Sequence, residues 1–175
     1  MPGPKLTKLY IGIDIGNSGA IAVMGSRGEF FTTTMPLIGK YLDIHATYLL
    51  LDKYRSSNCH VVFEDLSPIF NISAKANGSL MRSAGAIEAL VVALELPYTK
   101  VQAKVWQKEM FQGVREMTKP SSTKKTMVRD TKSMALMACK RLFPKVSLLA
   151  TERSKVPHNG IVDAILMAEF CKRKY

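Results

Sequence analysis

Five short runs of apolar and β-branched residues along the chain predict five β-strands. The first two runs flank a turn that contains Gly16 and Gly19, which predicts a hairpin, and Gly28 precedes the third run. Pro68 follows the fourth run and ends it, because proline cannot continue a central strand. The predicted strands are residues 9–15, 19–24, 29–34, 59–65 and 97–101.

Apolar residues at helical spacing predict five helices in the rest of the chain. Asp130 or Thr131 is suited to cap the fourth helix, and Pro144 ends it. Strands come first, helices and strands then alternate, and a helix closes the chain. This order predicts a single α/β domain over residues 1–175, with a mixed sheet flanked by helices. The predicted helices are residues 41–54, 79–95 and 106–112, a helix that follows the cap at Asp130 or Thr131 and runs through Met134 to Leu142, and residues 161–172.

The chain carries a strong excess of positive charge. Its 25 Lys and Arg residues outnumber 14 Asp and Glu residues, for a formal charge of +11 and a pI near 9.7. This bias favours a polyanionic partner, with nucleic acid ahead of an anionic membrane surface. Residues 115–132 alone carry six positive and two negative charges and no apolar period. We expect a mobile basic loop there, and the alternative is an ordinary solvated loop.

Cysteine usage and hydropathy restrict the cellular setting. Cys59, Cys139 and Cys171 show neither a disulfide framework nor zinc-ligand spacing, so we expect reduced thiols. No apolar run reaches the roughly 18 residues that a membrane span needs. The first residues also lack the apolar core of a signal peptide. We therefore expect a cytoplasmic protein without a membrane partner.

Three acidic residues lie in otherwise apolar surroundings. Asp14 interrupts the first predicted strand, Glu64 ends the fourth, and Asp163 lies in the first turn of the last predicted helix. A buried carboxylate is costly unless it is paired, and metal coordination is one way to offset that cost. Taken singly, they are explained equally well as a turn aspartate, a solvated strand end and a helix-dipole anion. Together they indicate a site for Mg²⁺ or Mn²⁺, which prefer oxygen ligands and, as a pair of ions, can cleave phosphodiesters.

Three segments around these acids resemble the acidic motifs of RuvC-type Holliday junction resolvases, and the phage and organellar branch is the most similar. The segments are residues 11–16, 61–64 and 158–168, and further likeness lies in residues 83–89, 105–108 and 130–135. The resemblance runs from about residue 8 to residue 172. The first motif alone is also similar to the opening of sugar kinases and chaperone ATPases. All three motifs in this order are more specific.

The resemblance implies an RNase H-like fold, a homodimer, and nicking of two strands across a four-way DNA junction with two Mg²⁺ (or Mn²⁺) ions. It implies that Asp14, Glu64 and Asp163 are metal ligands. A fourth acid of the family pattern falls on Asn159, whose amide oxygen can coordinate a metal but brings no charge. Either this chain tolerates an amide there, or it is a variant weakened in cleavage. His158 is suited to assist a water or contact a phosphate, and the alternative is an ordinary loop histidine.

The resemblance also suggests where DNA and a second protomer would be contacted. An apolar side chain after the second acid can wedge into the junction in this family, and Phe70 and Ile69 are candidates, with buried loop anchors as the alternative. Ser83, Gly85 and Ala86 are small enough for two helices to approach closely at a dimer interface. The basic residues that we expect to hold DNA phosphates are Lys104, Lys108, Arg115, Lys119, Lys124, Lys125, Arg129 and Lys132.

Three functions are compatible with these features. The first is a crossover junction endonuclease, and the second is a junction-binding protein that cleaves little because Asn159 replaces an acid. The third is an ATP-dependent phosphotransferase of the same superfold, which 175 residues are too few to build because such kinases need a second lobe. The charge of +11 also suits DNA better than a small substrate. The branch that the chain resembles favours a phage protein acting in the bacterial host cytoplasm.

Overall fold

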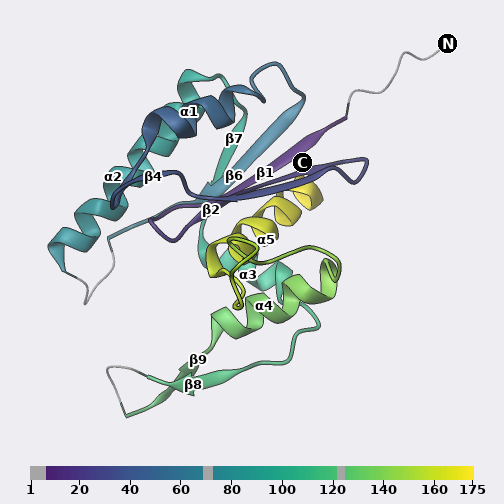
Figure 1. Cartoon of the computed structure of the whole chain (residues 1–175). Helices are drawn as coiled ribbons and strands as arrows, with labels where there is room; N and C mark the ends of the chain where they lie inside the picture. Colours follow the sequence, from purple (N-terminus) through teal and green to yellow (C-terminus); the bar gives the residue numbers. More distant parts are fainter. Residues whose placement is uncertain (1–6, 69–72, 122–124) are drawn as a thin grey trace.

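A computed structural model describes residues 7–68, 73–121 and 125–175, and in these residues five strands form a twisted central sheet (Figure 1). Its order is β3-β2-β1-β6-β7. β1 pairs antiparallel with β2 and parallel with β6, so the sheet is mixed, as the sequence predicts. The strands are β1 (Leu9–Asp14), β2 (Ala20–Gly25), β3 (Phe30–Thr34), β6 (Cys59–Glu64) and β7 (Tyr98–Val101).

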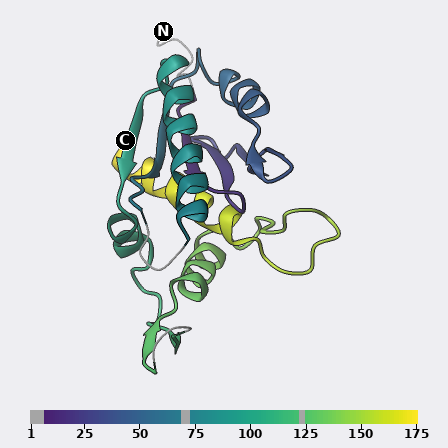
Figure 2. The ribbon, with the colours of Figure 1, turned by 90° about the vertical axis from the view of Figure 1, so that its left-hand side faces the viewer.

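Helices cover both faces of this sheet. Figures 1 and 2 show α1 and α2 on one face and α3, α4 and α5 on the other, so the predicted α/β architecture is confirmed. The described helices are α1 (Ile44–Asp52), α2 (Ala74–Ala93), α3 (Ala103–Met110), α4 (Thr131–Leu142) and α5 (Asn159–Lys174).

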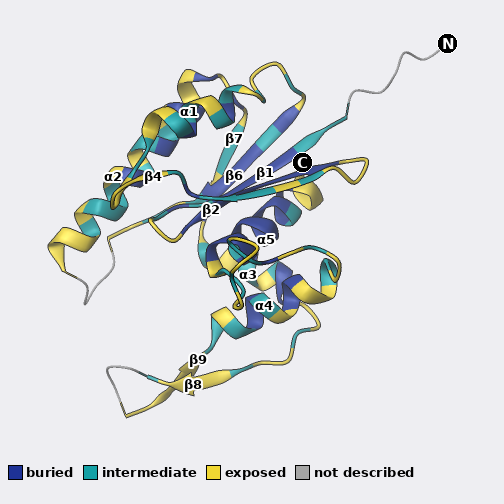
Figure 3. Ribbon diagram, in the orientation of Figure 1, coloured by how far each residue is buried: buried dark blue, intermediate teal, exposed yellow. Residues whose placement is uncertain are grey.

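Alternation along β1 divides the core into two layers. Ile11 and Ile13 pack with the residues of α1 and α2, whereas Tyr10 packs with those of α3, α4 and α5. Successive side chains of a strand point to opposite faces, so Asp14 lies on the same face as Tyr10, toward α5. Figure 3 shows that burial is concentrated in the central strands and in α5.

Two glycines allow α5 to lie directly against the sheet. A Cβ on Gly12 of β1 would collide with the backbone of α5 at Ala164 and Ala168. A Cβ on Gly160, at the start of α5, would collide with the backbone of Ser18 in the turn after β1. The space beside Gly12 is filled by the backbone of α5. This contact positions the start of α5 beside the carboxyl end of β1.

The first two helices begin at other residues than predicted. A short hairpin of β4 (Leu37–Ile38) and β5 (Tyr41–Leu42) occupies the predicted start of α1. α1 begins only after Asp43, whose side chain accepts a hydrogen bond from the Ala46 N–H. α2 begins five residues earlier than predicted, because the Ser73 hydroxyl caps it by accepting from the Ala76 N–H.

The basic segment 115–132, expected to be a mobile loop without regular structure, contains a second small hairpin. β8 (Thr118–Pro120) pairs antiparallel with β9 (Met127–Arg129) and extends away from the sheet (Figure 1). The physical reason is local: Met127 and Val128 suit a strand, and the Lys119 ammonium lies 3.2 Å from the Asp130 carboxylate across the hairpin base. The expected motion of this segment stays a prediction.

The last helix also begins earlier than predicted. α5 starts at Asn159, so Asp163 lies beyond its first turn, and the expectation of a first-turn anion stabilised by the helix dipole is wrong. The three cysteines are buried free thiols, as expected. No helix in the described part of the chain is both long and apolar enough to cross a bilayer.

Candidate functional site

The carboxyl ends of two neighbouring parallel strands bring two acids together. Ile13 of β1 is paired with Phe63 of β6, so Asp14 and Glu64 occupy the next position of each strand. Val62 belongs to the core layer under α5, and Glu64, two residues later, lies on the same face. Asp163 reaches this edge from α5, whose first turns pack on β1 and the β1–β2 turn.

The three carboxyl groups influence one another electrostatically. Burial raises the pKa of Asp14 well above its ordinary range, and the charges of Asp163 and Glu64 raise it further. Burial, reinforced by the charge of Glu64, raises the pKa of Asp163 to about 7. Lys132 opposes both shifts. The sequence-predicted acids are therefore neighbours in space.

Glu64 has a dedicated hydrogen-bond partner. Burial raises the pKa of Glu64, and the Trp106 indole opposes this shift. The Trp106 Nε1–H of α3 donates to Glu64 Oε1 at 2.8 Å, and the indole ring is 1% exposed. Sequence reasoning missed this role, although the chain's single tryptophan in a charged segment was a signal for it. A buried indole needs a partner for its N–H, and here the partner is an acid of the site.

A pocket of about 290 Å³ opens at this edge of the sheet. Asp14, Asp163, Asn159, His158 and Lys132 line it, and Glu64 does not. Within residues 7–68, 73–121 and 125–175, no three His, Cys, Asp or Glu side chains are close enough together to hold one ion. The arrangement therefore differs from a single-ion site with three carboxylate ligands.

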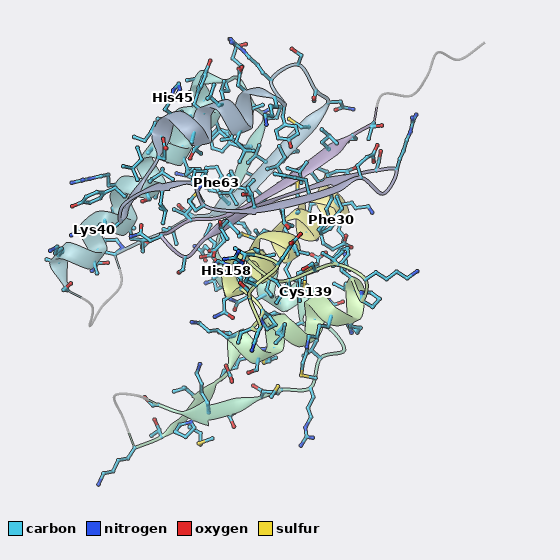
Figure 4. All side chains as sticks on the ribbon, viewed as in Figure 1. Phe30, Lys40, His45, Phe63, Cys139 and His158 are labelled. Carbon is cyan, nitrogen blue, oxygen red and sulfur yellow. The ribbon has the colours of Figure 1, made fainter. Side chains whose placement is uncertain are left out.

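His158 and Asn159 form the start of α5. Figure 4 shows His158 at this end of the helix. His158 is the N-cap residue, and its Nδ1 accepts a hydrogen bond from the Ile161 N–H at 3.3 Å. This contact occupies Nδ1 and leaves Nε2 to face a ligand, and it is a structural role that sequence reasoning missed. Asn159 is exposed and lines the pocket, so its amide is available to a ligand there.

The basic residues expected to bind DNA differ in their surroundings. Lys132 alone reaches the acidic pocket. Lys119 and Arg129 lie within 3.2 Å of Asp130 and 3.8 Å of Glu116, so acidic neighbours already offset part of their charge. Lys124, Phe70 and Ile69 lie outside the described residues. The remaining four are exposed away from the pocket: Lys104, Lys108, Arg115 and Lys125.

The fold is similar to that of a solved structure described as Thermus thermophilus RuvC in complex with a Holliday junction substrate. The two share 14% sequence identity at a TM-score of 0.51, over 91% of this chain and 90% of that chain. The chain has a RuvC-like fold. A second structure of T. thermophilus RuvC matches with 17% identity and a TM-score of 0.49, over 94% and 95% of the two chains. No protein-family model and no curated protein sequence matches.

The expected RuvC-like, RNase H-like fold is thus confirmed, and the phage or organellar branch stays a prediction. At this edge of the RuvC-like sheet the donor set consists of oxygen atoms: the carboxylates of Asp14, Glu64 and Asp163 and the amide of Asn159. Hard divalent cations such as Mg²⁺ and Mn²⁺ prefer these donors. Carboxylates whose burial raises their pKa are also poorly stabilised as bare anions, which favours a cation beside them.

Proposed function

We propose that this protein is a crossover junction endodeoxyribonuclease, a structure-selective endonuclease that resolves four-way DNA junctions by metal-dependent phosphodiester hydrolysis. One observation carries the proposal: buried Asp14 lies at a pocket beside Asp163 and near Glu64, whose charges both raise its pKa further, in a chain of charge +11. The RuvC-like fold supports it, because a solved protein of that fold is described in complex with a Holliday junction.

The donor set suits two dications better than one. Asp14, Asp163 and Asn159 face the pocket and would hold one ion, and Glu64 with Asp14 would hold the second. When bound, Mg²⁺ or Mn²⁺ lowers the pKa of an attacking water and stabilises the charge on the leaving oxygen. The absence of three close His, Cys, Asp or Glu side chains among the described residues is consistent with sharing, since phosphate and amide oxygens complete each shell.

The remaining residues of the site orient the acids and the substrate. The Trp106 N–H fixes one oxygen of Glu64, which leaves the other free to coordinate. Lys132 favours the ionised forms of Asp14 and Asp163 and is suited to bind a phosphate oxygen of the strand being cut. His158 uses Nδ1 to cap α5, so its Nε2–H is the nitrogen that can donate to phosphate or water.

A junction-binding protein with weak cleavage is the second candidate. It is favoured by Asn159, which brings an uncharged amide to a site with three acids. Phosphate contacts supply most of the affinity for DNA, so loss of one acidic ligand would weaken cleavage far more than binding.

A nicking assay separates the two candidates. The substrates are a synthetic four-way junction and a linear duplex of the same sequences, incubated with Mg²⁺, Mn²⁺ or EDTA. We expect the wild type to nick the junction only with metal, and Asp14→Asn to bind it without nicking. If Asn159 replaces a catalytic acid, Asn159→Asp raises the rate by about 10²-fold or more, in the range of a missing charge-stabilising ligand. Equal cleavage of junction and duplex would contradict junction selectivity.

We also propose a homodimer, which would present two sites to two strands. On α2, Ser83 is buried inside the chain, whereas Gly85 is exposed and a Cβ there would meet no atom within 4 Å. The surface around Gly85 is therefore open to a second helix. Sedimentation at tens of micromolar protein, compared between wild type and Gly85→Glu, tests this assignment, and a monomeric wild type contradicts it. A phage origin and a host-cytoplasmic location remain part of the same proposal.

A further inference from the structure

A second pocket, of about 420 Å³, lies between the β4–β5 hairpin, the β1–β2 turn and the first half of α2. Three cationic side chains line it, Lys40 from the hairpin and Lys75 and Arg82 from α2, and no acidic residue does. Lys75, Ser79 and Arg82 follow one another at i, i+4 and i+7, so they share one face of the helix. Figure 4 shows Lys40 beside α2.

The cations of this basic pocket are free to bind an anion. Among the described residues, none of Lys40, Lys75 and Arg82 forms an ion pair with an acidic side chain. The half-exposed ring of Tyr41 collects two of them: Lys40 Nζ lies 5.8 Å and Arg82 Cζ 5.7 Å from its centroid. Converging like charges repel one another, and a phosphate between them would relieve that repulsion.

The pocket is tied to the backbone that forms the acidic site. Lys40 lies in a two-residue turn between β4 and β5, where Gly39 has a φ of +61° that suits glycine. The Asn17 Nδ2–H donates to the Lys40 carbonyl oxygen at 2.7 Å. Asn17 belongs to the β1–β2 turn, directly before Ser18, which lines the acidic pocket. The hairpin tip and the acids are therefore held by the same short turn.

A continuous series of depressions connects the two pockets. A shallow intermediate pocket shares Asn17, Ala76 and Ser79 with the basic pocket, and it shares Ser18 with the acidic one. A DNA strand that places one phosphate at the acids carries a further charge at every following nucleotide. The basic pocket lies at the other end of this path, where one of those charges would arrive.

We propose that the basic pocket binds a backbone phosphate of the DNA strand whose neighbouring phosphodiester is cut at the acidic site. This inference rests on the proposed nuclease function. Lys40, Lys75 and Arg82 neutralise the phosphate, and the hydroxyl of Ser79 is placed to donate to it. Asn17 is a positioning residue: it sets the distance from the bound phosphate to the acids, and hence which bond is cut.

The first test measures junction binding in EDTA, where no cleavage occurs, at several salt concentrations. The variant is Lys40→Gln/Lys75→Gln/Arg82→Gln. The matched control is Lys53→Gln/Arg55→Gln/Lys172→Gln. It removes three exposed charges near the amino ends of β1 and β6, opposite the strand ends that carry the acids. We expect the pocket variant to bind about tenfold more weakly near 0.15 M salt and to reduce the salt slope by about 0.9 for each phosphate that it no longer neutralises. The control should change affinity less than about threefold, since distant exposed charges are largely screened.

The outcomes separate this inference from the proposed function. Failure of the wild type to bind a junction in preference to a duplex overturns the proposed function and the inference with it. Junction binding with the same salt slope in the pocket variant and the control overturns the subsite alone. A third outcome would assign the pocket to a free anion. In that case inorganic phosphate stabilises the wild type against unfolding as much as DNA does, and the pocket variant binds the junction with unchanged affinity.

A second test locates the phosphate on the strand. Single methylphosphonate substitutions, which remove one phosphate charge at a time, are placed along the cut strand. We expect one position near the cut to weaken wild-type binding and to have no further effect on the pocket variant. Asn17→Ala keeps every cation, so it should leave the salt slope unchanged while cleavage with Mg²⁺ spreads to adjacent phosphodiesters. Cleavage at one unchanged bond would exclude the positioning role of Asn17.

Discussion

Replacing Asp163 by asparagine should stabilise the metal-free protein while it removes activity. Burial is the main cause that raises the pKa of this carboxyl from 3.8 to about 7, and the nearby charge of Glu64 adds to the shift. Each pKa unit corresponds to about 1.36 kcal/mol, so ionised Asp163 costs the folded state at most about 4 kcal/mol. For a chain of this size that amounts to about 8–16 °C in Tm. The isosteric amide carries no such cost.

The pH dependence has a definite sign. Between about pH 4 and pH 7 the folded protein holds a proton on Asp163 that the unfolded chain has released. The contribution of Asp163 to stability is therefore greatest below its unfolded pKa and is lost as the pH rises through its folded pKa. Urea unfolding in EDTA from pH 4.5 to pH 8.5 should show this decrease in the wild type and a flatter profile in Asp163→Asn.

The exposed acid Glu152 provides the matched control, since Glu152→Gln should leave the profile unchanged. Adding Mg²⁺ should stabilise the wild type above pH 7 and have little effect on Asp163→Asn, because a bound cation removes the cost of the ionised acid. Equal wild-type and Asp163→Asn stability at pH 8 in EDTA would refute the reasoning, because it would mean that burial imposes no cost on this carboxyl.

Further substitutions probe the hydrogen bond to Glu64, the packing of α5 on β1 and the β8–β9 hairpin. Trp106→Phe removes the N–H donor to Glu64 and should cost about 1–3 kcal/mol in urea unfolding, with a higher Mg²⁺ requirement for nicking; an unchanged Mg²⁺ dependence would contradict its orienting role. Gly12→Ala should destabilise by about 3 kcal/mol or more, because its methyl group meets the α5 backbone, whereas Gly78→Ala in α2 meets no atom and should stabilise by up to about 1 kcal/mol. Lys119→Gln/Lys125→Gln should lower the salt slope of junction binding by about 0.9 for each phosphate no longer neutralised, and an unchanged slope would leave the β8–β9 hairpin as solvated surface.

The strands and the acids could be predicted because each acid stands out against an apolar run. Asp14 and Glu64 follow buried apolar residues, and parallel pairing of their strands is enough to make them neighbours. The position of Asp163 depends on a different kind of information, the close packing of α5 on Gly12. A glycine in a strand indicates a close approach but does not say which part of the chain approaches.

Features made by few residues or by tertiary contacts could not be predicted. The β4–β5 hairpin has two residues in each strand, which is too short for any periodicity to emerge. Lys132 was one of eight basic candidates. Only its position at the start of α4, which lies beside Asp14 and Asp163, distinguishes it. The cap formed by His158 depends on a ring nitrogen accepting a backbone hydrogen bond, a role for which serine, threonine, aspartate and asparagine are the usual signals.

Charge crowding gives Asn159 a physical meaning beyond a missing ligand. Three acids already share this edge of the sheet, and their mutual repulsion contributes to the raised pKa of Asp14. A fourth carboxylate at position 159 would add to that repulsion whenever no cation is bound. Because the position is exposed, water would screen the added cost to about 1 kcal/mol or less. The amide therefore reduces the cost of the metal-free state and, in exchange, weakens the attraction for a second dication.

This exchange predicts opposite effects of Asn159→Asp on stability and on metal response. In EDTA at pH 8 the variant should unfold at a slightly lower urea concentration than the wild type, and Mg²⁺ should stabilise it more. Titrating Mg²⁺ against Tm for both proteins measures the two effects in one experiment. A variant with wild-type stability in EDTA and a wild-type Mg²⁺ response would mean that residue 159 does not interact electrostatically with Asp14 and Asp163. Slow nicking by the wild type would then need a cause other than the asparagine.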